Sequence, residues 1–378
     1  MFVRQSTLTD IAQIETALAP LSEPSPQWVL VFASPAWFRQ PGFFPALRST
    51  FADARLSGCS TAGEIGTEGV TAGACVVTAI SWDGPPPVQV AAPIAAMADS
   101  LAAGMRLGRE LPPAAAVLVF APGVNINGSA LVEGLASGLP AGTPIMGGLA
   151  GDDGKFTETF TLADDGIHAH TAVALALPAK LHIGHGSFGG WKPFGPARKV
   201  TRSSGNVLFE LDGEPALEIY KRYLGDYARD LPASGLLFPF EMLGADHSAM
   251  GLIRTILGID EKTGGLILAG DIDPRGYLRL MQASTDALVS GAETAAASTL
   301  KTLAGAAGGG LAILVSCVGR KLVMGGRVDE EVEAVADVLG NNVTLAGFYS
   351  YGEISPFSAG TECKLHNQTM TITCLTES

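Results

Sequence analysis

Short apolar runs alternate with amphipathic segments along this chain. Three runs stand out, WVLVFAS from Trp28, AVLVFAP from Ala116 and LAILVSC from Leu311. Continuous apolar runs of this length are typical of strands that are buried on both faces of a sheet. They predict the central strands of the fold.

A helix is predicted over residues 329–339, DEEVEAVADVL. Val332 and Val335 recur at helical spacing and form its apolar face, and the acids, Glu331 among them, are expected largely around the rest. Acidic residues in the first turn also suit the positive end of the helix dipole.

An internal repeat organises the chain. Each apolar run is followed by a glycine-rich segment that ends in a glycine–acid pair, which predicts three strand–helix–strand units. The segments are LSGCSTAGEIG, IMGGLAGDDG and LAGFYSYGEIS, with the pairs Gly63-Glu64, Gly151-Asp152 and Gly352-Glu353. A hairpin signal at Asp165-Gly166 adds antiparallel strands. We therefore expect an α/β (mixed α+β) fold of mixed β-sheets flanked by helices.

Length and composition predict two domains. A chain of 378 residues exceeds the size at which one core stops growing. The stretch GHGSFGGWKPFGPARK is rich in glycine and proline, and it ends near Pro193–Arg198. We place the boundary there, which gives domains 1–193 and 194–378.

The composition argues against a membrane protein and against nucleic-acid binding. The longest uncharged stretch, Leu111–Val132, is interrupted by prolines, and the first residues contain no apolar signal core. The net charge is −13 and no basic stripe is visible. Five cysteines form no CxxC pair, which fits reduced thiols rather than a metal site. We expect a cytoplasmic protein without a membrane segment.

Several segments together resemble the FIST family, whose name refers to F-box and intracellular signal transduction proteins. They are GCSTAGEIG, GGLAGDD, VTRSSGNVLFELDGEPALEIYKRYLG, SCVGR and YGEISP followed by HNQT. The resemblance covers nearly the whole chain, with an N-terminal FIST portion to about Pro193 and a C-terminal portion after it. One departure is Leu365, where the family is associated with an aromatic residue.

The resemblance implies a sensory protein of bacterial signalling that binds a small ligand, such as an amino acid. It carries no established catalytic constellation. Some members are reported to bind haem and respond to nitric oxide, so a haem sensor is the alternative. The expected partners are the small molecule and a downstream signalling protein, such as a kinase or chemoreceptor.

The candidate ligand-binding residues lie in the glycine–acid turns and in HNQT. They are Cys59, Ser60, Thr61, Glu64, Arg320, Tyr349, Tyr351, Glu353, His366, Asn367 and Gln368. Glu64 and Glu353 face a ligand ammonium in one interpretation and accept local backbone N–H groups in the other. For Asp152 the local role is favoured. If 349–353 is one strand, its two tyrosines and its acid share a face.

Two further interpretations concern Cys59 and the arginines. Cys59 is either a buried thiol, which we favour, or the nucleophile of a hydrolase or transferase with His366 as its base. A hydrolase or transferase that uses the acidic residues of the turns in place of Cys59 is part of the same alternative. Arg320 either clamps a ligand carboxylate or pairs with a neighbouring acid. Arg202 and Arg254, inside predicted strands, are expected to point outward.

The haem alternative rests on two histidines. His182 and His185 alternate with apolar residues in KLHIGHGSFGGW, and either one is a candidate axial ligand. No other cofactor and no metal ion are expected.

Overall fold

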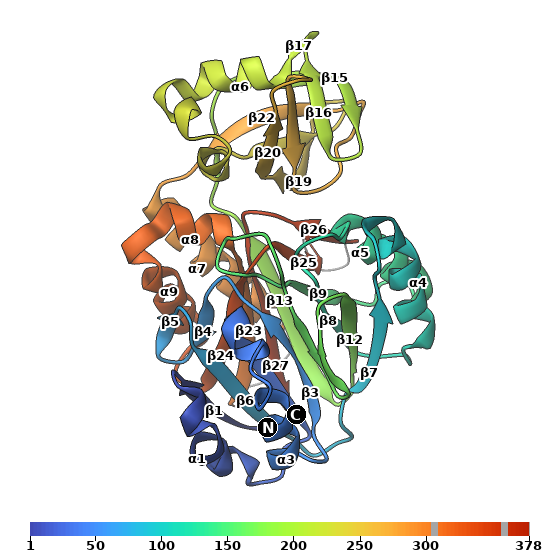
Figure 1. Ribbon diagram of the computed structural model, residues 1–378, viewed down its shortest axis with the longest axis vertical. Coiled ribbons are helices and arrows are strands. Elements are labelled where there is room, and N and C mark those ends of the chain that lie inside the picture. Colours follow the sequence, from blue (N-terminus) through green and yellow to red (C-terminus); the bar gives the residue numbers. More distant parts are fainter. Residues whose placement is uncertain (304–308, 357–361, 378) are drawn as a thin grey trace.

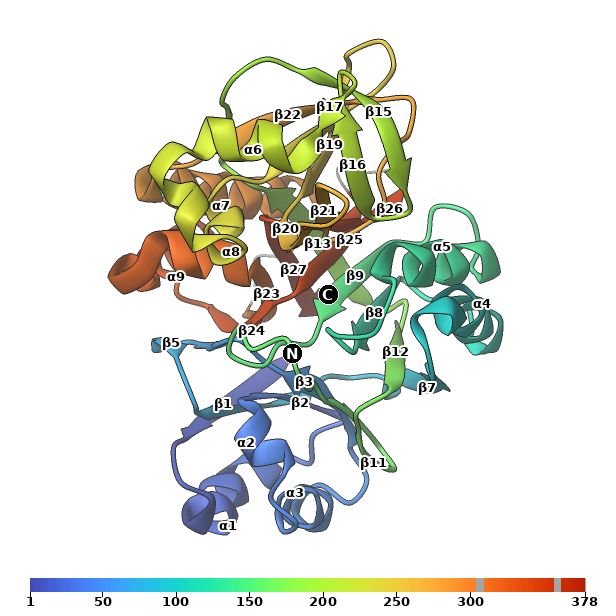
Figure 2. The ribbon, with the colours of Figure 1, turned by 45° about the horizontal axis from the view of Figure 1, so that its top comes forward.

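The computed structural model describes residues 1–303, 309–356 and 362–377. It contains a body of three similar units and a smaller module, which stands above the body in Figure 1. In Figure 2 the helices of the three units occupy separate corners of the body, below, right and left of its centre. The predicted mixed α/β class is confirmed, because each unit combines parallel and antiparallel strands with covering helices.

Each unit contributes four main strands and the helices that cover them. The first unit has β1 (Phe2–Leu8), β2 (Trp28–Ala33), β3 (Arg55–Ser60) and β6 (Cys75–Ser81), with α1 (Ile14–Leu18), α2 (Pro35–Phe38) and α3 (Phe43–Thr50). The second has β7 (Val88–Pro93), β8 (Ala116–Ala121), β9 (Ile145–Leu149) and β12 (Thr171–Leu177), with α4 (Ser100–Glu110) and α5 (Gly128–Gly138). The third has β13 (Leu181–Phe188), β23 (Gly310–Cys317), β24 (Val343–Ser350) and β27 (Met370–Glu377), with α7 (Thr285–Thr302), α8 (Val318–Met324) and α9 (Asp329–Leu339).

The units exchange hairpins in a cycle. The hairpins are β4 (Glu64–Gly66) with β5 (Gly69–Thr71), β10 (Thr161–Ala163) with β11 (Gly166–His168), and β25 (Gly352–Pro356) with β26 (Cys363–His366). The sheet orders are β1-β6-β2-β3-β10-β11, β7-β12-β8-β9-β25-β26 and β13-β27-β23-β24-β4-β5. The first unit thus completes the third sheet, the second completes the first, and the third completes the second. Two of these three sheets therefore contain strands from both sides of residue 193.

The three sheets meet along a common axis. The rings of Phe32, Phe120 and Phe348 contact one another there, with centroids 4.9 to 6.2 Å apart. The parallel strands approach closely at Gly147, where φ is +128° and an added Cβ would lie 1.9 Å from the Val119 oxygen. Only glycine fits such a position.

Backbone hydrogen bonds repeat the cycle at the ends of the parallel strands. The N–H of Ala62 donates to the Tyr349 oxygen at 2.8 Å, and the N–H of Tyr351 donates to the Leu149 oxygen at 3.1 Å. The third bond runs from Gly151 N–H to the Ser60 oxygen at 2.8 Å. The glycine-rich turns therefore lock the three units to one another.

The module is inserted in the third unit between β13 and α7. Its elements are β14 (Lys192–Pro193), β15 (Arg198–Ser204), β16 (Val207–Leu211), β17 (Glu214–Pro215), α6 (Ala216–Leu224), β18 (Phe240–Leu243), β19 (Ala249–Arg254), β20 (Ile256–Asp260), β21 (Gly265–Leu268) and β22 (Tyr277–Gln282). These strands form one antiparallel sheet. The module has an apolar core of its own, in which α6 packs against side chains of the sheet such as Leu208 and Phe240. No helix in the described ranges is long and apolar enough to span a membrane.

Candidate functional site

Glu64 and Glu353 occupy equivalent turns, and both are buried with their oxygens already hydrogen-bonded. Glu353 accepts from Ser350 Oγ at 2.7 Å and from Thr369 N and Oγ1 at 3.0 and 2.9 Å. Glu64 accepts in the same way from Thr61 Oγ1 at 2.5 Å, and also from Ala74 N at 3.0 Å. Each acid ties its turn to the residue just before the last strand of its unit. Burial raises the pKa of both carboxyls, for Glu353 to about 7.

The third acid of the repeat, Asp152, holds an irregular loop in place. It accepts hydrogen bonds from the N–H groups of Phe156, Thr157 and Glu158 at 2.8 to 3.0 Å, and from the Tyr351 hydroxyl. Burial works against the charged form, but these hydrogen bonds outweigh it and lower the pKa of Asp152. The local role favoured from the sequence matches this geometry.

The alignment of the repeat needs a correction at this acid. Gly58, Gly147 and Gly347 pair with equivalent positions of the neighbouring parallel strand. Counting six residues onward gives Glu64 and Glu353, as predicted, but Asp153 rather than Asp152. The sequence alignment was therefore one residue out of step in the second unit, where the loop before β10 is longer.

Arg320 lies in a buried ion pair. Its Nε and Nη2 donate to Glu331 Oε2 at 3.1 and 2.7 Å. The other oxygen of Glu331 accepts from the Tyr349 hydroxyl at 2.6 Å and from Ser316 Oγ at 3.0 Å. The prediction that Glu331 lies on the polar face of its helix was wrong, because Arg320 attracts it inward. This network fastens α8 and α9 to β23 and β24.

The three side chains expected on one face of residues 349–353 bond to separate partners. Tyr349 bonds Glu331, Tyr351 bonds Asp152, and Glu353 bonds Ser350. The single strand assumed for 349–353 is interrupted between β24 and β25, so the alternation of faces does not run through. That expectation was wrong.

The HNQT segment links β26 to β27 and is buried. Its His366 pairs with Glu353 in the antiparallel register of β25 and β26. Asn367 and Gln368 form the buried turn into β27, and Gln368 Nε2 donates to the Leu236 oxygen of the module at 3.0 Å. Burial lowers the pKa of His366 to about 4. The segment joins the module to the body.

Cys59 is fully buried, and so are Ser60 and Thr61. Burial raises the pKa of the Cys59 thiol well above its usual range, which opposes a nucleophilic role. Ser60 donates to the Gly151 oxygen at 2.8 Å and accepts from Phe160 N–H at 2.8 Å. These turn residues are therefore buried and bond to other segments of the protein.

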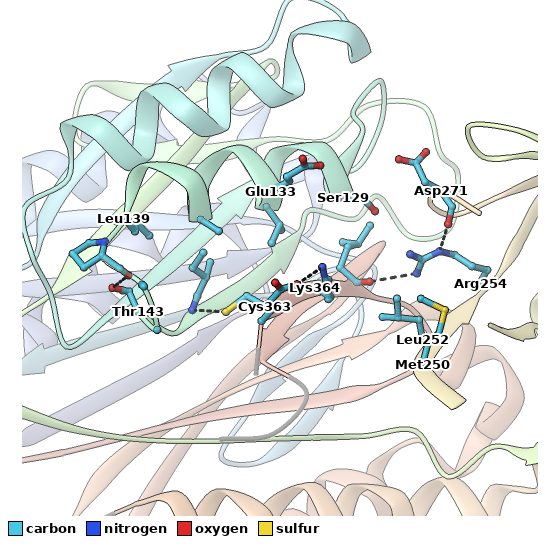
Figure 3. A pocket seen from close by; sticks show the side chains of 18 residues that line it. Ser129, Glu133, Leu139, Thr143, Met250, Leu252, Arg254, Asp271, Cys363 and Lys364 are labelled. Carbon is cyan, nitrogen blue, oxygen red and sulfur yellow. Dashed lines mark hydrogen bonds and ion pairs between the residues drawn. The ribbon is translucent and has the colours of Figure 1, made fainter. Parts of the chain in front are cut away.

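Two cavities lie where the module meets the second unit. The larger one, about 660 Å³, is bounded by α5, β26 and β19 (Figure 3). The smaller one, about 340 Å³, is bounded by the loop 123–128, Tyr351 and the segment 268–271. Asp271 and Leu365 line both cavities, so the two are adjacent, and we call them together the cleft. Of the residues predicted for the site, only Tyr351 lines it.

Exposed apolar side chains gather in this cleft. Met97, Phe156 and Leu257 line the smaller cavity, and Met250 lines the larger one, each 39 to 50% exposed. The Phe156 ring stacks on Tyr351 with centroids 4.0 Å apart. Apolar side chains gathered in a concave site are typical of small-molecule binding sites.

Arg254 is the charged residue buried at the larger cavity, with 4% of its surface exposed. Its Nε donates to the Asp271 oxygen at 3.0 Å, and its Nη1 donates to the Ile253 and Leu365 oxygens at 3.2 and 3.3 Å. Burial lowers the pKa of Arg254 to about 10, and the charge of Asp271 acts in the opposite direction.

The expectation that Arg254 points outward was wrong. Leu252, two residues before it on β19, is also buried, and strand alternation places both on one face. Arg202 is exposed, as expected, and pairs with Glu210 at 2.9 Å.

Neither histidine of the haem alternative lines the cleft. His182 and His185 are three residues apart on β13, so they lie on opposite faces of the strand. His185 is buried, and burial lowers its pKa. The cleft therefore does not fit a haem held by either residue. Within the described ranges no group of three potential metal ligands occurs.

The fold and the cleft define an α/β protein with a cavity between two packed bodies. Family models match residues 27–214 as a FIST N domain and residues 216–356 as a FIST C domain. The chain belongs to the FIST family. FIST domains are associated with sensing in signal transduction.

Two individual proteins show weaker similarity. An uncharacterized protein of Methanocaldococcus jannaschii is 33% identical over 90 residues, which is 23% of this chain and 17% of that protein's length. A crystal structure of cyanuric acid hydrolase from A. caulinodans aligns over 100% of this chain and 99% of its own, at 11% identity and a TM-score of 0.32. The second likeness is too low to carry an argument.

Proposed function

We propose that this protein senses a small polar ligand, such as an amino acid, in the cleft between the module and the second unit. The observation that carries the proposal is the cleft, which is lined from both bodies and has the buried Arg254 in the wall of its larger cavity. The association of the family with sensing supports the same conclusion.

The charges of the cleft are arranged for a zwitterion. Glu133, Asp271 and Glu362 are exposed acids among the lining residues, Lys364 is an exposed cation that pairs with Glu362, and Arg254 is the buried charge. A ligand with an ammonium and a carboxylate group would have opposite charges to meet at both places. Apolar residues such as Val132 and Leu252 line the same cavity and suit a hydrocarbon side chain.

A ligand that contacts both bodies would change how firmly the module is held. Such a shift is a means of passing the bound state to a downstream signalling protein. A kinase or a chemoreceptor remains the partner that we propose.

The test is a thermal-shift screen of the twenty standard amino acids with two helix variants. Ala136 lines the larger cavity, whereas its neighbour Ser137 is exposed on the same helix and does not. We expect at least one amino acid to raise the Tm of the parent and of Ser137→Trp, but not of Ala136→Trp. An absence of any shift in the parent, or an equal shift in both variants, would contradict the proposal.

A further inference from the structure

Arg254, which lines the larger cavity, has N–H groups that donate to no described residue. A guanidinium carries five N–H groups, and three of those on Arg254 reach the backbone oxygens of Ile253, Asp271 and Leu365. Both N–H groups on Nη2 remain, and no described residue accepts a hydrogen bond from them. Figure 3 shows the guanidinium reaching from β19 toward β26.

The charge of Arg254 is also not matched by a direct ion pair. None of the acidic residues in the described ranges forms an ion pair with it, although the other buried arginine, Arg320, has Glu331 at 2.7 Å. The Asp271 carboxylate instead accepts from Asn127 Nδ2 at 3.5 Å. A buried cation without a counter-ion is costly, so a permanent structural role alone does not account for this arrangement.

We propose that Arg254 is the anion anchor of the cleft and binds the carboxylate of the ligand through Nη2. This inference rests on the proposed function and adds the group that the ligand must carry. A carboxylate suits the guanidinium because its two oxygens match the fork of N–H donors. The ligand class is a small carboxylic acid with an apolar body, and the ammonium of an amino acid is a secondary feature.

The same side chain connects binding to the junction of the two bodies. Nη1 of Arg254, in the module, donates to the Leu365 oxygen of β26, in the body. A carboxylate on Nη2 fixes the guanidinium in the orientation that makes this bond. Ligand binding therefore strengthens the contact between module and body.

The experiment compares each amino acid with its carboxamide, which keeps the ammonium and the side chain but lacks the negative charge. Affinities are measured by calorimetry on the parent, on Arg254→Met and on Arg254→Lys. The control is Arg202→Met, the same change at an exposed arginine of the same module. Circular dichroism verifies that each variant is folded.

We expect the carboxamide to bind the parent roughly 10- to 100-fold more weakly than the amino acid, the range for losing one charged hydrogen-bonding partner. Arg254→Met loses this discrimination, Arg254→Lys keeps part of it, and Arg202→Met keeps all of it. If Arg254→Met does not fold, the parent and Arg254→Lys decide the matter.

Equal binding of acid and carboxamide by the parent, or undiminished discrimination by Arg254→Met, overturns the anchor and leaves the cleft as the ligand site. If no amino acid binds the parent at all, the proposed function fails and the anchor fails with it.

Discussion

Glu353 should make the stability of this protein fall as the pH rises through neutrality. The carboxyl is fully buried, and burial raises its pKa from 4.5 to about 7 despite hydrogen bonds from Ser350 and Thr369. Below about pH 4.5 the group is protonated in the folded and in the unfolded chain, so its favourable contribution is fully present. Above that pH the unfolded chain ionises first, and the contribution is lost until the folded pKa is passed.

The magnitude follows from the two pKa values. Their difference, 7 minus 4.5, is about 2.5 pH units, and one unit corresponds to about 1.36 kcal/mol, so the loss is about 3 kcal/mol. The change Glu353→Gln removes the titration. The amide keeps the hydrogen bonds, because its oxygen faces Thr369 and its NH₂ donates to Ser350 Oγ, whose hydroxyl turns away.

The assay is urea unfolding, followed by tryptophan fluorescence from pH 5 to pH 8. We expect the free energy of unfolding of Glu353→Gln to rise relative to that of the parent as the pH increases. From pH 5 to pH 8 this difference should grow by most of about 3 kcal/mol. The pKa of Glu64 is raised in the same direction, so the difference between variant and parent is the quantity to compare. Glu68→Gln, at an exposed turn, is the control. Parallel curves for parent and Glu353→Gln would refute the reasoning.

Three other experiments test the structural assignments. Arg320→Met leaves Glu331 as a buried unpaired charge and should lower the free energy of unfolding by about 3–5 kcal/mol. Adding Glu331→Leu should restore much of this loss. Equal stability of the single and double variants would contradict the ion pair. Gly147→Ala should prevent folding or destabilise it severely, as judged by circular dichroism, whereas Gly326→Ala, which has open space, should be near neutral. Cys59 should react with a thiol reagent only after unfolding, and rapid labelling of the native protein at this residue would revive the nucleophile.

The candidate site shows where reasoning from the sequence reached its limit. The repeat correctly placed Glu64 and Glu353 at equivalent turns, six residues after Gly58 and Gly347. The partners of these groups were not visible in the sequence. Both acids proved to be saturated by neighbouring hydroxyl and N–H groups, whereas Arg254, which we set aside, retains unused donors.

Local periodicity determined the secondary structure, because the spacing of apolar residues within a strand or helix shows which of its faces is buried. The apolar runs, the helix at 329–339 and the repeat followed from it, whereas the family followed from the motifs that resemble it. The tertiary structure decided which unit receives each hairpin and where the inserted module rests. These choices bring together residues far apart in the chain, such as Tyr351 with Asp152 and Arg254 with Leu365. Whether a buried polar group meets a protein partner or a ligand depends on such contacts, and no local pattern records them.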